Sequence, residues 1–390
     1  MRILVVTIAT QSGAARLVLD TCALLAATGH EFRFVLINRK GAWGPEFEAL
    51  GACLDWPSAQ DAEGGGRVRL GKKVRSFWET RAWREFVDDW NPELVYLNSA
   101  AVCRALCAFA DGEIPVVMQT TRLCTPFRDE LAKVPDRYVA VSEAVKRHLV
   151  SDWQIEEGRI SVCRGGIDPA RIDRALKEAT PGSRRERFDF IVGGCGKTTW
   201  IKGVDIWLHA AAEVRQLVAG RNIGFVWCGG PRPARGGKWD MEHLFREIRL
   251  LGLEDVVEFT DHLDNPFPVV SEFDVLAMPS REDSFPLATL EAMYLGKPVV
   301  YFRACGGNVE MAADDAGVPV ERFSSVAMAR EVADLLLNRR RRVRMGEKAR
   351  EKVLGAFTTA RLAAEVQGVI ESVISGRGAR EPREDGTPNR

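Results

Sequence analysis

The chain has 390 residues, of which 46% are hydrophobic and 28% are charged, and its 54 basic and 54 acidic side chains balance to a net charge of zero. This length accommodates two globular domains with separate cores. The balanced charge argues against general nucleic-acid binding, and no apolar run approaches the roughly 18 residues that span a membrane.

Predicted strands and helices alternate through the first half of the chain. Residues 2–9 are a continuous apolar run typical of a central parallel strand, and the small-residue loop ATQSGAA follows it. The remaining elements follow in this order: helix 17–27, strands 32–37 and 94–98, helix 100–110, strands 115–119 and 138–141, helix 142–149 and strand 160–162. This order predicts a doubly wound domain, in which Gly13 either brings the backbone close to a ligand or only makes the turn.

Residues 67–90 differ from the rest of this half because basic side chains dominate them, with Trp78, Trp83 and Trp90 interleaved. Such a stretch suits a helix that lies on an anionic membrane surface. It also suits an ordinary solvated helix face with buried aromatic side chains, which is the interpretation we favour. We therefore expect at most a weak peripheral contact of 67–90 with the inner face of the membrane.

A polar, charged segment at 176–189 that contains Pro and Gly predicts an interdomain linker. We expect an N-terminal domain at 1–180 and a C-terminal domain at 184–360. The second domain repeats the strand–helix order: strands 190–194, 223–228 and 256–259, with helices 204–217, 241–250, 328–337 and 342–357. A last helix at 361–374 is expected to cross back to the first domain, and the polar residues 375–390 are expected to form a disordered tail.

Residues 273–302 form the most informative unit of the second half. The sequence predicts a strand at 274–278, a loop at 279–283, a helix, and a strand at 298–302. Ser284 is expected to cap the helix and Pro286 to stand in its first turn. Asp283 and Glu291 lie eight positions apart, with the free N–H groups of the helix start between them. This arrangement suits a ligand with a diphosphate at one end and hydroxyl groups at the other.

The segment GGCGKTTWIKG at 193–203 is a second candidate for binding phosphate. A P-loop would need glycine five positions before Gly196, and that position is Ile191, so the Walker A motif is excluded. What remains is a loop between a strand and a helix that carries Lys197 and Lys202. Two ammonium groups there suit a leaving diphosphate, although each could also be a solvated surface lysine.

Nothing in the sequence predicts a metal site or a cofactor. The nine cysteines are odd in number and lack C-x-x-C spacing, and several lie in apolar strands, which indicates reduced, buried thiols in a cytoplasmic protein. The N-terminal MRILVV is too short for a signal peptide. The five histidines have no metal-binding spacing, and D-x-D does not occur. Of the histidines, His262 alone adjoins the expected site.

The second half resembles the glycosyl transferases group 1, the nucleotide-sugar-dependent family 4 (GT4) of retaining enzymes with the GT-B fold. The matching segments, in family order, are GKTTWIKGVD, FVWCGG, LGLEDVVEFTDHLDN, PSREDSFPLATLEAMYLGKPVV and AGVPV. The first half resembles the family more loosely, through the Gly13 loop and VAVSEAVKRHLV with GGID. The resemblance covers about residues 1–370 and implies two Rossmann-like domains that face each other across a cleft.

The resemblance assigns roles to residues by position. Lys197 and Lys202 correspond to the family's Arg and Lys and would bind the donor diphosphate, which Gly13 would approach from the other domain. Asp283 and Glu291 match the family's E-x7-E pair, so Glu291 would hold the ribose and Asp283 would lie beside the transferred sugar. The remaining donor-binding assignments are Ser284, Phe285, Pro286 and Leu287 for sugar hydroxyls or phosphate, and Gly230 and His262 beside the base.

Two departures from the family pattern concern the chemistry. Asp283 is one methylene shorter than the family's Glu, which argues against a direct nucleophilic role. Many relatives carry a His at the end of the strand that here reads VVMQTTR. On this acceptor side we expect Asn98, Gln119 and Arg122 instead.

The resemblance implies a metal-independent transfer of a hexose or hexosamine from a nucleoside diphosphate sugar, UDP- or GDP-linked, to an acceptor hydroxyl with retention of configuration. The acceptor would be a glycan, a lipid-linked molecule or a small molecule. Two alternatives remain open: a nucleotide-sugar epimerase of the same fold, which needs no acceptor, and an inactive nucleotide-sugar-binding protein.

Overall fold

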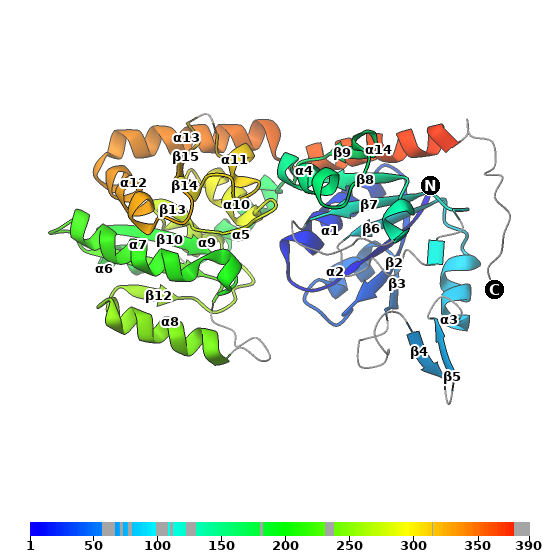
Figure 1. The fold of residues 1–390 in the computed structure, drawn as a ribbon, viewed down its shortest axis with the longest axis horizontal. Coiled ribbons are helices and arrows are strands. Elements are labelled where there is room, and N and C mark those ends of the chain that lie inside the picture. The colour runs from blue at the N-terminus through cyan, green and yellow to red at the C-terminus, as the bar shows by residue number, and fades with distance from the viewer. Residues whose placement is uncertain are drawn as a thin grey trace.

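The structure, a computed structural model, describes residues 1–56, 67–70, 73–76, 80–98, 108–109, 112–121, 130–179, 182–230, 238–313 and 315–377. These residues form two halves, each built around a parallel β-sheet flanked by helices, that lie side by side along the long axis of the molecule (Figure 1). The predicted fold class, two doubly wound Rossmann-like units, is confirmed.

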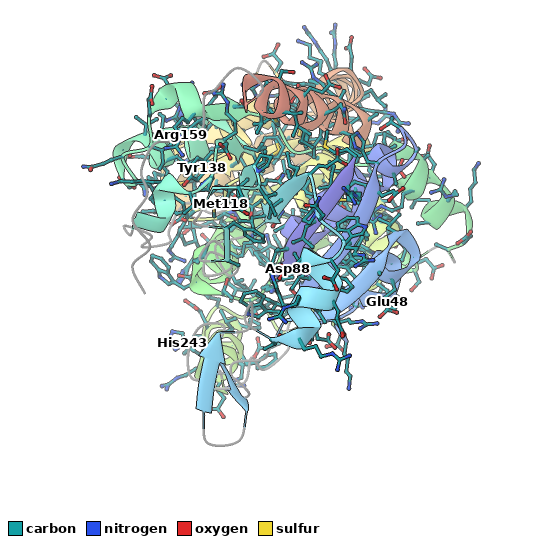
Figure 2. The ribbon with its side chains drawn as sticks, turned by 90° about the vertical axis from the view of Figure 1, so that its right-hand side faces the viewer. Glu48, Asp88, Met118, Tyr138, Arg159 and His243 are labelled. Atoms are coloured by element: carbon teal, nitrogen blue, oxygen red, sulfur yellow. The ribbon has the colours of Figure 1, made fainter. Side chains whose placement is uncertain are left out.

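The first sheet contains seven parallel strands in the order β3-β2-β1-β6-β7-β8-β9. Its strands are β1 (Arg2–Ile8), β2 (Glu31–Ile37), β3 (Ala52–Asp55), β6 (Leu94–Asn98), β7 (Val116–Thr120), β8 (Arg137–Ala140) and β9 (Ile160–Val162). The central strands β6 and β7 are buried along their whole length, which explains their uninterrupted apolar runs. Met118 and Tyr138, labelled in Figure 2, are register partners on neighbouring strands and are fully buried.

Helices flank this sheet. They are α1 (Gly13–Ala26), α2 (Gly44–Leu50), α3 (Arg81–Trp83), which continues into a π-helical turn (Arg84–Asp88), and α4 (Glu143–Ser151). Helix α1 begins earlier than predicted, because Ser12 is its N-cap and accepts a hydrogen bond from the backbone N–H of Ala15 at 3.3 Å. Gly13 is therefore the first residue of a helix that follows β1 after a short loop at 9–12.

The second sheet contains six parallel strands in the order β12-β11-β10-β13-β14-β15. Its strands are β10 (Phe190–Cys195), β11 (Ile223–Cys228), β12 (Val257–Phe259), β13 (Val275–Met278), β14 (Val299–Phe302) and β15 (Gly317–Val320). The helices of this half are α7 (Val204–Leu217), α8 (Lys238–Leu250), α9 (Phe267–Ser271), α10 (Leu287–Tyr294), α11 (Asn308–Met311), α12 (Ser325–Leu337) and α13 (Arg339–Ala356).

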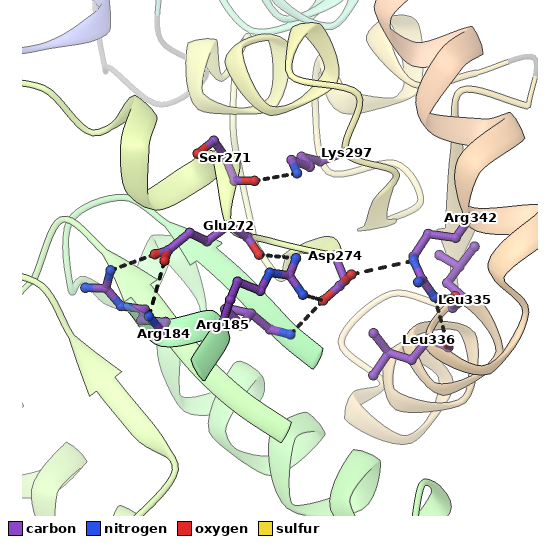
Figure 3. Close-up of polar contacts among 10 residues, drawn as sticks. Arg184, Arg185, Ser271, Glu272, Asp274, Lys297, Leu335, Leu336 and Arg342 are labelled. Carbon is purple, nitrogen blue, oxygen red and sulfur yellow. Dashed lines mark hydrogen bonds and ion pairs between the residues drawn. The ribbon is translucent and has the colours of Figure 1, made fainter. Parts of the chain in front are cut away.

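The second part of the predicted linker at 176–189 is bound to the second half by ion pairs. Helix α5 (Pro169–Lys177) leads out of the first half, and the short helix α6 (Arg184–Arg187) docks on the second. Arg184 forms ion pairs with Glu258 and Glu272. Figure 3 shows its pair with Glu272 and the pair of Arg185 with Asp274, which measures 2.7 Å. These ion pairs attach the segment to the second sheet before β10 begins.

The chain passes between the halves a second time near its end. Helix α14 (Thr359–Arg377) leaves α13 and packs against α1 and β8 of the first half. The two crossings are hydrogen-bonded side by side: the N–H of Ile167 donates to Phe357 O at 3.0 Å, and that of Thr359 donates to Ile167 O at 2.9 Å. A Cβ on Gly166 would lie 2.4 Å from the Thr358 backbone, so the backbones of the two crossing segments are in direct contact.

Several predictions of local structure need correction. The basic stretch does not begin as a helix: β4 (Arg67–Leu70) and β5 (Lys73–Ser76) form an antiparallel hairpin, visible at the lower edge of Figure 1. Trp83 is buried, whereas Trp78 and most of the predicted helix 100–110 lie outside the described residues. Helix α14 continues to Arg377, beyond the predicted 374, and 378–390 also lie outside them. Within the described ranges, no helix is long and apolar enough to cross a membrane.

Candidate active site

A cavity of about 400 Å³ lies between the two halves and is lined by both. Most residues singled out from the sequence line it: Gly13 from the first half, and Lys197, Lys202, His262, Asp283, Ser284, Phe285, Pro286, Leu287 and Glu291 from the second. Because parallel strands end at the same edge of each sheet, the loops that follow them meet in this cleft.

The carboxylate of Asp283 is paired with the ammonium group of Lys202 on the cavity wall. Ser280 Oγ donates a second hydrogen bond to the same carboxylate oxygen at 3.2 Å. The side chains are only 11% and 24% exposed, so the pair is largely shielded from water. From the sequence, Lys202 and Asp283 were both expected to contact one ligand, and the structure also brings them into contact with each other.

The backbone of Asp283 is fixed by the loop after β14. Its N–H donates to Cys305 O at 3.0 Å, and its carbonyl accepts from the N–H of Gly307 at 2.9 Å. Gly306, between these partners, has φ of +107°, and a Cβ there would lie 1.7 Å from the Asp283 carbonyl oxygen. Only glycine fits this position without displacing Asp283.

The start of α10 differs from the prediction. Its N-cap is Pro286 and no side chain caps it, so the assignment of Ser284 as N-cap is wrong. Ser284 Oγ instead donates a hydrogen bond across the cleft to the backbone carbonyl of Thr121 at 2.7 Å. The first N–H groups of α10 are thus left without a side-chain cap beside the cavity, where an anionic ligand group could accept from them.

Glu291 stands in the second turn of α10 and is 17% exposed. Burial raises the pKa of this carboxyl group above its usual range, while the guanidinium groups of Arg171 and Arg16 oppose that rise. Arg171 lies 3.6 Å from the Glu291 carboxylate. Glu291 is therefore an acceptor whose charge depends on two arginines from outside its own helix.

Arg16 and Arg171 were not identified from the sequence as site residues. Arg16 stacks on Trp43, with its guanidinium carbon 5.1 Å from the ring centroid, and Arg171 stacks on Phe267 at 5.3 Å. The Nε atom of each is buried and has no hydrogen-bond partner among the described residues. The available signal was position: Arg16 follows Gly13 by three residues, and Arg171 follows the GGID segment.

The loops that follow β10 and β11 form another part of the wall. Cys195 and Cys228 are register partners at the ends of these strands and both line the cavity. Lys197 is exposed beside them. Gly230, which was expected beside the base, is not one of the residues that line the cavity. Gly229 lines it instead, and its N–H donates to Thr260 Oγ1 at 3.2 Å.

The residues expected on the acceptor side lie deeper than predicted. Asn98 Nδ2 donates to Gln119 Oε1 at 2.8 Å, and both side chains are buried without lining the cavity. Thr121 lines the cavity instead, while Arg122 lies outside the described residues. Among the residues that the structure describes, no group of three or more His, Cys, Asp or Glu side chains is arranged to hold a metal ion.

Two protein families match the chain, one in each half. The family described as Glycosyltransferase Family 4 matches residues 11–171, and that described as Glycosyl transferases group 1 matches residues 189–338. The D-inositol 3-phosphate glycosyltransferase of Corynebacterium glutamicum is 28% identical over 74% of this chain and 68% of its own length. That of Mycolicibacterium vanbaalenii is 30% identical over 64% of this chain, but the match spans only 55% of its own length.

Solved structures share the fold over nearly the whole chain. A glycosyltransferase from Rickettsia africae superposes with a TM-score of 0.76 and 17% identity, covering 96% of this chain and 98% of its own. The Anabaena protein HepE, solved in complex with UDP and glucose, superposes with the same TM-score and identity, covering 95% of this chain and 100% of its own. At these identities the similarity establishes the fold alone.

Proposed function

We propose, for a chain that belongs to the group 1 glycosyl transferases with the GT-B fold, that it transfers a hexose or hexosamine from a nucleoside diphosphate sugar to an acceptor hydroxyl. The proposal depends above all on one observation. A single cavity between the halves gathers the Lys202–Asp283 pair, the uncapped start of α10 and Glu291. Lys202 and the start of α10 match the chemistry of a diphosphate, Asp283 that of a sugar, and Glu291 that of a ribose.

The donor would lie with its diphosphate against Lys202, Lys197 and the first N–H groups of α10. Glu291 would accept hydrogen bonds from the ribose hydroxyls, and Gly229 and His262 would flank the base. Arg171 would hold the Glu291 carboxylate in its charged form. Gly13, at the start of α1, would approach the diphosphate from the other half.

Transfer would proceed with retention of configuration and without a metal ion. The positive charge of Lys202 would stabilise the negative charge that develops on the leaving phosphate. The leaving phosphate would accept the proton of the acceptor hydroxyl as that hydroxyl attacks the same face of the sugar. Asp283 would orient Lys202 and the transferred sugar, since its carboxylate is already occupied by Lys202 and Ser280.

UDP is the donor nucleotide that we propose first, because HepE, which shares the fold, binds UDP and UDP-glucose. The relatives' name makes an inositol phosphate the first acceptor to test, ahead of glycans and lipid-linked acceptors. We place the protein in the cytoplasm, with domains at 1–180 and 184–360, and retain a weak peripheral membrane contact of 67–90 as part of the proposal.

The decisive experiment measures transfer directly. The full chain is incubated with radiolabelled UDP-glucose or UDP-N-acetylglucosamine, with and without inositol 3-phosphate, in the presence of EDTA. We expect acceptor-dependent UDP release and a labelled product, whose anomeric configuration is read by NMR. An epimerase would convert the nucleotide sugar without acceptor, and an inactive binding protein would bind UDP with no turnover; either outcome would overturn the proposal.

A further inference from the structure

Glu310, on α11 of the second half, contacts two groups of the first half. Its Oε1 accepts a hydrogen bond from the backbone N–H of Ala144 at 3.3 Å, in the first turn of α4. Its Oε2 lies 3.1 Å from Nε of Arg164, which follows β9. The Glu310 side chain is 16% exposed, so this carboxylate is largely enclosed between the halves.

The partners of Glu310 suit a negative charge. The first N–H groups of α4 carry the positive end of a helix dipole, and Arg164 supplies a full positive charge. Arg164 also binds Glu143 at 3.2 Å, but Glu143 belongs to the same half as Arg164. Of these two carboxylates, Glu310 alone joins the halves. The chain therefore offers a natural comparison between a cross-half contact and a local one.

Glu310 is linked to the backbone of Asp283 through a short segment of chain. Helix α11 begins directly after Gly307, whose N–H binds the Asp283 carbonyl. Asn308 Oδ1 accepts a hydrogen bond from Thr289 of α10 at 2.9 Å, and both side chains are buried. Glu310 lies three positions after Gly307, which is hydrogen-bonded to Asp283, so we expect a displacement of Glu310 to shift the wall that holds Asp283.

The loop after β9, which carries Arg164, makes a second contact with the second half, at Phe285. Gly165 follows Arg164, and a Cβ on it would lie 2.6 Å from the ring of Phe285, so backbone and ring are in close contact. Ser284, between Asp283 and Phe285, binds the carbonyl of Thr121. The 283–285 segment is therefore held against the first half at three points: Thr121, Gly165 and, through α11, Arg164.

We propose that Glu310 is a positioning residue that latches the two halves together and thereby places Asp283 for sugar transfer. Its kinetic consequence rests on the proposed function, because the latch acts on the transfer step. The donor-binding groups named above lie mostly on the second half and do not touch Glu310. The latch should accordingly govern turnover, while the affinity for the donor nucleotide stays the same.

The kinetic test compares Glu310→Gln with Glu143→Gln, which removes the local partner of the same arginine. We expect E310Q to lower kcat by about tenfold, in the range of ordinary coupling energies, with the Kd for UDP within about twofold of wild type. We expect E143Q to leave both quantities within about twofold of wild type. Equal losses in the two variants, or an E310Q enzyme with wild-type kcat, would overturn the proposal.

A double variant separates the latch from general destabilisation. If Arg164 and Glu310 act as one unit, Arg164→Gln combined with E310Q should lower kcat little further than E310Q alone. Multiplicative losses would mean independent effects and would contradict the proposal. Thermal unfolding of each variant shows that the comparison is made on folded protein.

A solution measurement tests the latch without any assay of turnover. Small-angle X-ray scattering of the full chain with saturating UDP should give a larger radius of gyration for E310Q than for wild type and E143Q. Identical profiles for all three proteins would overturn the latch even if transfer is confirmed. Conversely, absence of any transfer together with a clear difference in scattering would overturn the proposed function and leave the latch standing.

Discussion

Lys202 and Asp283 form a largely buried ion pair at the wall of the interdomain cavity, although 81 positions of sequence separate them. One residue precedes α7 and the other precedes α10, so the pair joins the ends of two neighbouring strands, β10 and β13. The cation that we propose to bind the donor diphosphate is thus paired with a carboxylate of the protein itself. The pair keeps Lys202 in place and limits the cost of enclosing its charge.

Lys202→Met should abolish measurable transfer and weaken UDP binding by about tenfold or more, since a charge-assisted hydrogen bond to phosphate is lost. It should also destabilise the fold by about 1–3 kcal/mol, because Asp283 is left enclosed without a partner. Isothermal titration with UDP and urea unfolding measure the two effects.

The double variant Lys202→Met with Asp283→Asn separates these effects. We expect it to recover most of the stability of the wild type and none of the activity. If the double variant were no more stable than K202M alone, the buried pair would not explain the loss of stability.

Glu291→Gln should weaken UDP binding by about tenfold through the loss of a charged acceptor for ribose hydroxyls. It should not reduce stability, because burial raises the pKa of Glu291 and the charged form is disfavoured by folding. A melting temperature equal to or above that of wild type, together with weaker binding in titration calorimetry, is the expected result. If the melting temperature and the affinity for UDP both fell, Glu291 would have a structural role instead.

Arg171→Met should move the pH at which UDP binding is lost to higher values. Glu291 already has a raised pKa, and Arg171 is the main group that counteracts the rise, so removing it extends protonation further towards neutral pH. UDP affinity measured from pH 5 to pH 8 checks this shift. Arg174→Met is the matched control, because Arg174 lies on the same helix but is exposed and, among the described residues, pairs its side chain with Asp168 alone, at 3.8 Å.

Lys297 should make the free energy of unfolding depend on pH in the alkaline range. Burial lowers its pKa to about 8 from an ordinary value of 10.5, and its ammonium group donates to Ser271 O at 2.6 Å (Figure 3). Between these two values the folded protein releases the proton before the unfolded chain does. The free energy of unfolding therefore rises with pH in that interval, by up to about 3 kcal/mol.

Lys297→Met removes this contribution. Urea unfolding at pH 7.5, 8.5 and 9.5 should show wild type gaining stability relative to the variant as the pH rises. Other lysines and tyrosines titrate alike in both proteins, so the difference between the two curves reports Lys297. Parallel curves would contradict the lowered pKa.

Gly306→Ala should impair both folding and activity, because its φ of +107° disfavours a side chain and its Cβ would overlap the Asp283 carbonyl oxygen. We expect a loss of roughly 2 kcal/mol or more in stability and a large fall in kcat. Gly368→Ala is the control: it lies inside α14, and nothing is within 4 Å of its Cβ position. It should stabilise the protein by about 0.5–1 kcal/mol.

The sequence allowed prediction of the architecture because strong local patterns coincide with the tertiary structure. The apolar run at 2–9 and the strand–helix–strand unit at 273–302 need little information beyond their own residues. Lys202, Asp283 and Glu291 could be singled out because each lies in a short segment that matches a family motif, and all three line the cavity. The contact between Lys202 and Asp283 could not be predicted in this way, because 81 positions separate them.

The missed features depend on contacts between distant segments. Ser284 has the composition of an N-cap, but the Thr121 carbonyl from the other half is its actual partner. Arg171 enters the site only because α5 leads from one half to the other beside Phe267. The hairpin at 67–76 is a local feature that could have been recognised: Val68, Leu70 and Val74 alternate with basic residues, which is a strand pattern, but the basic residues were read as one face of a helix.

The paired crossings at Ile167 and Thr358 restrict how the two halves can move. A single connecting segment would allow both bending and twisting, whereas two segments joined by a parallel β-bridge resist being twisted relative to each other. We therefore expect the halves to move mainly as a hinge at this bridge. Opening and closing would then follow a single path, and each return would bring Thr121, Gly165 and Arg164 back to the same places opposite Asp283 and its neighbours.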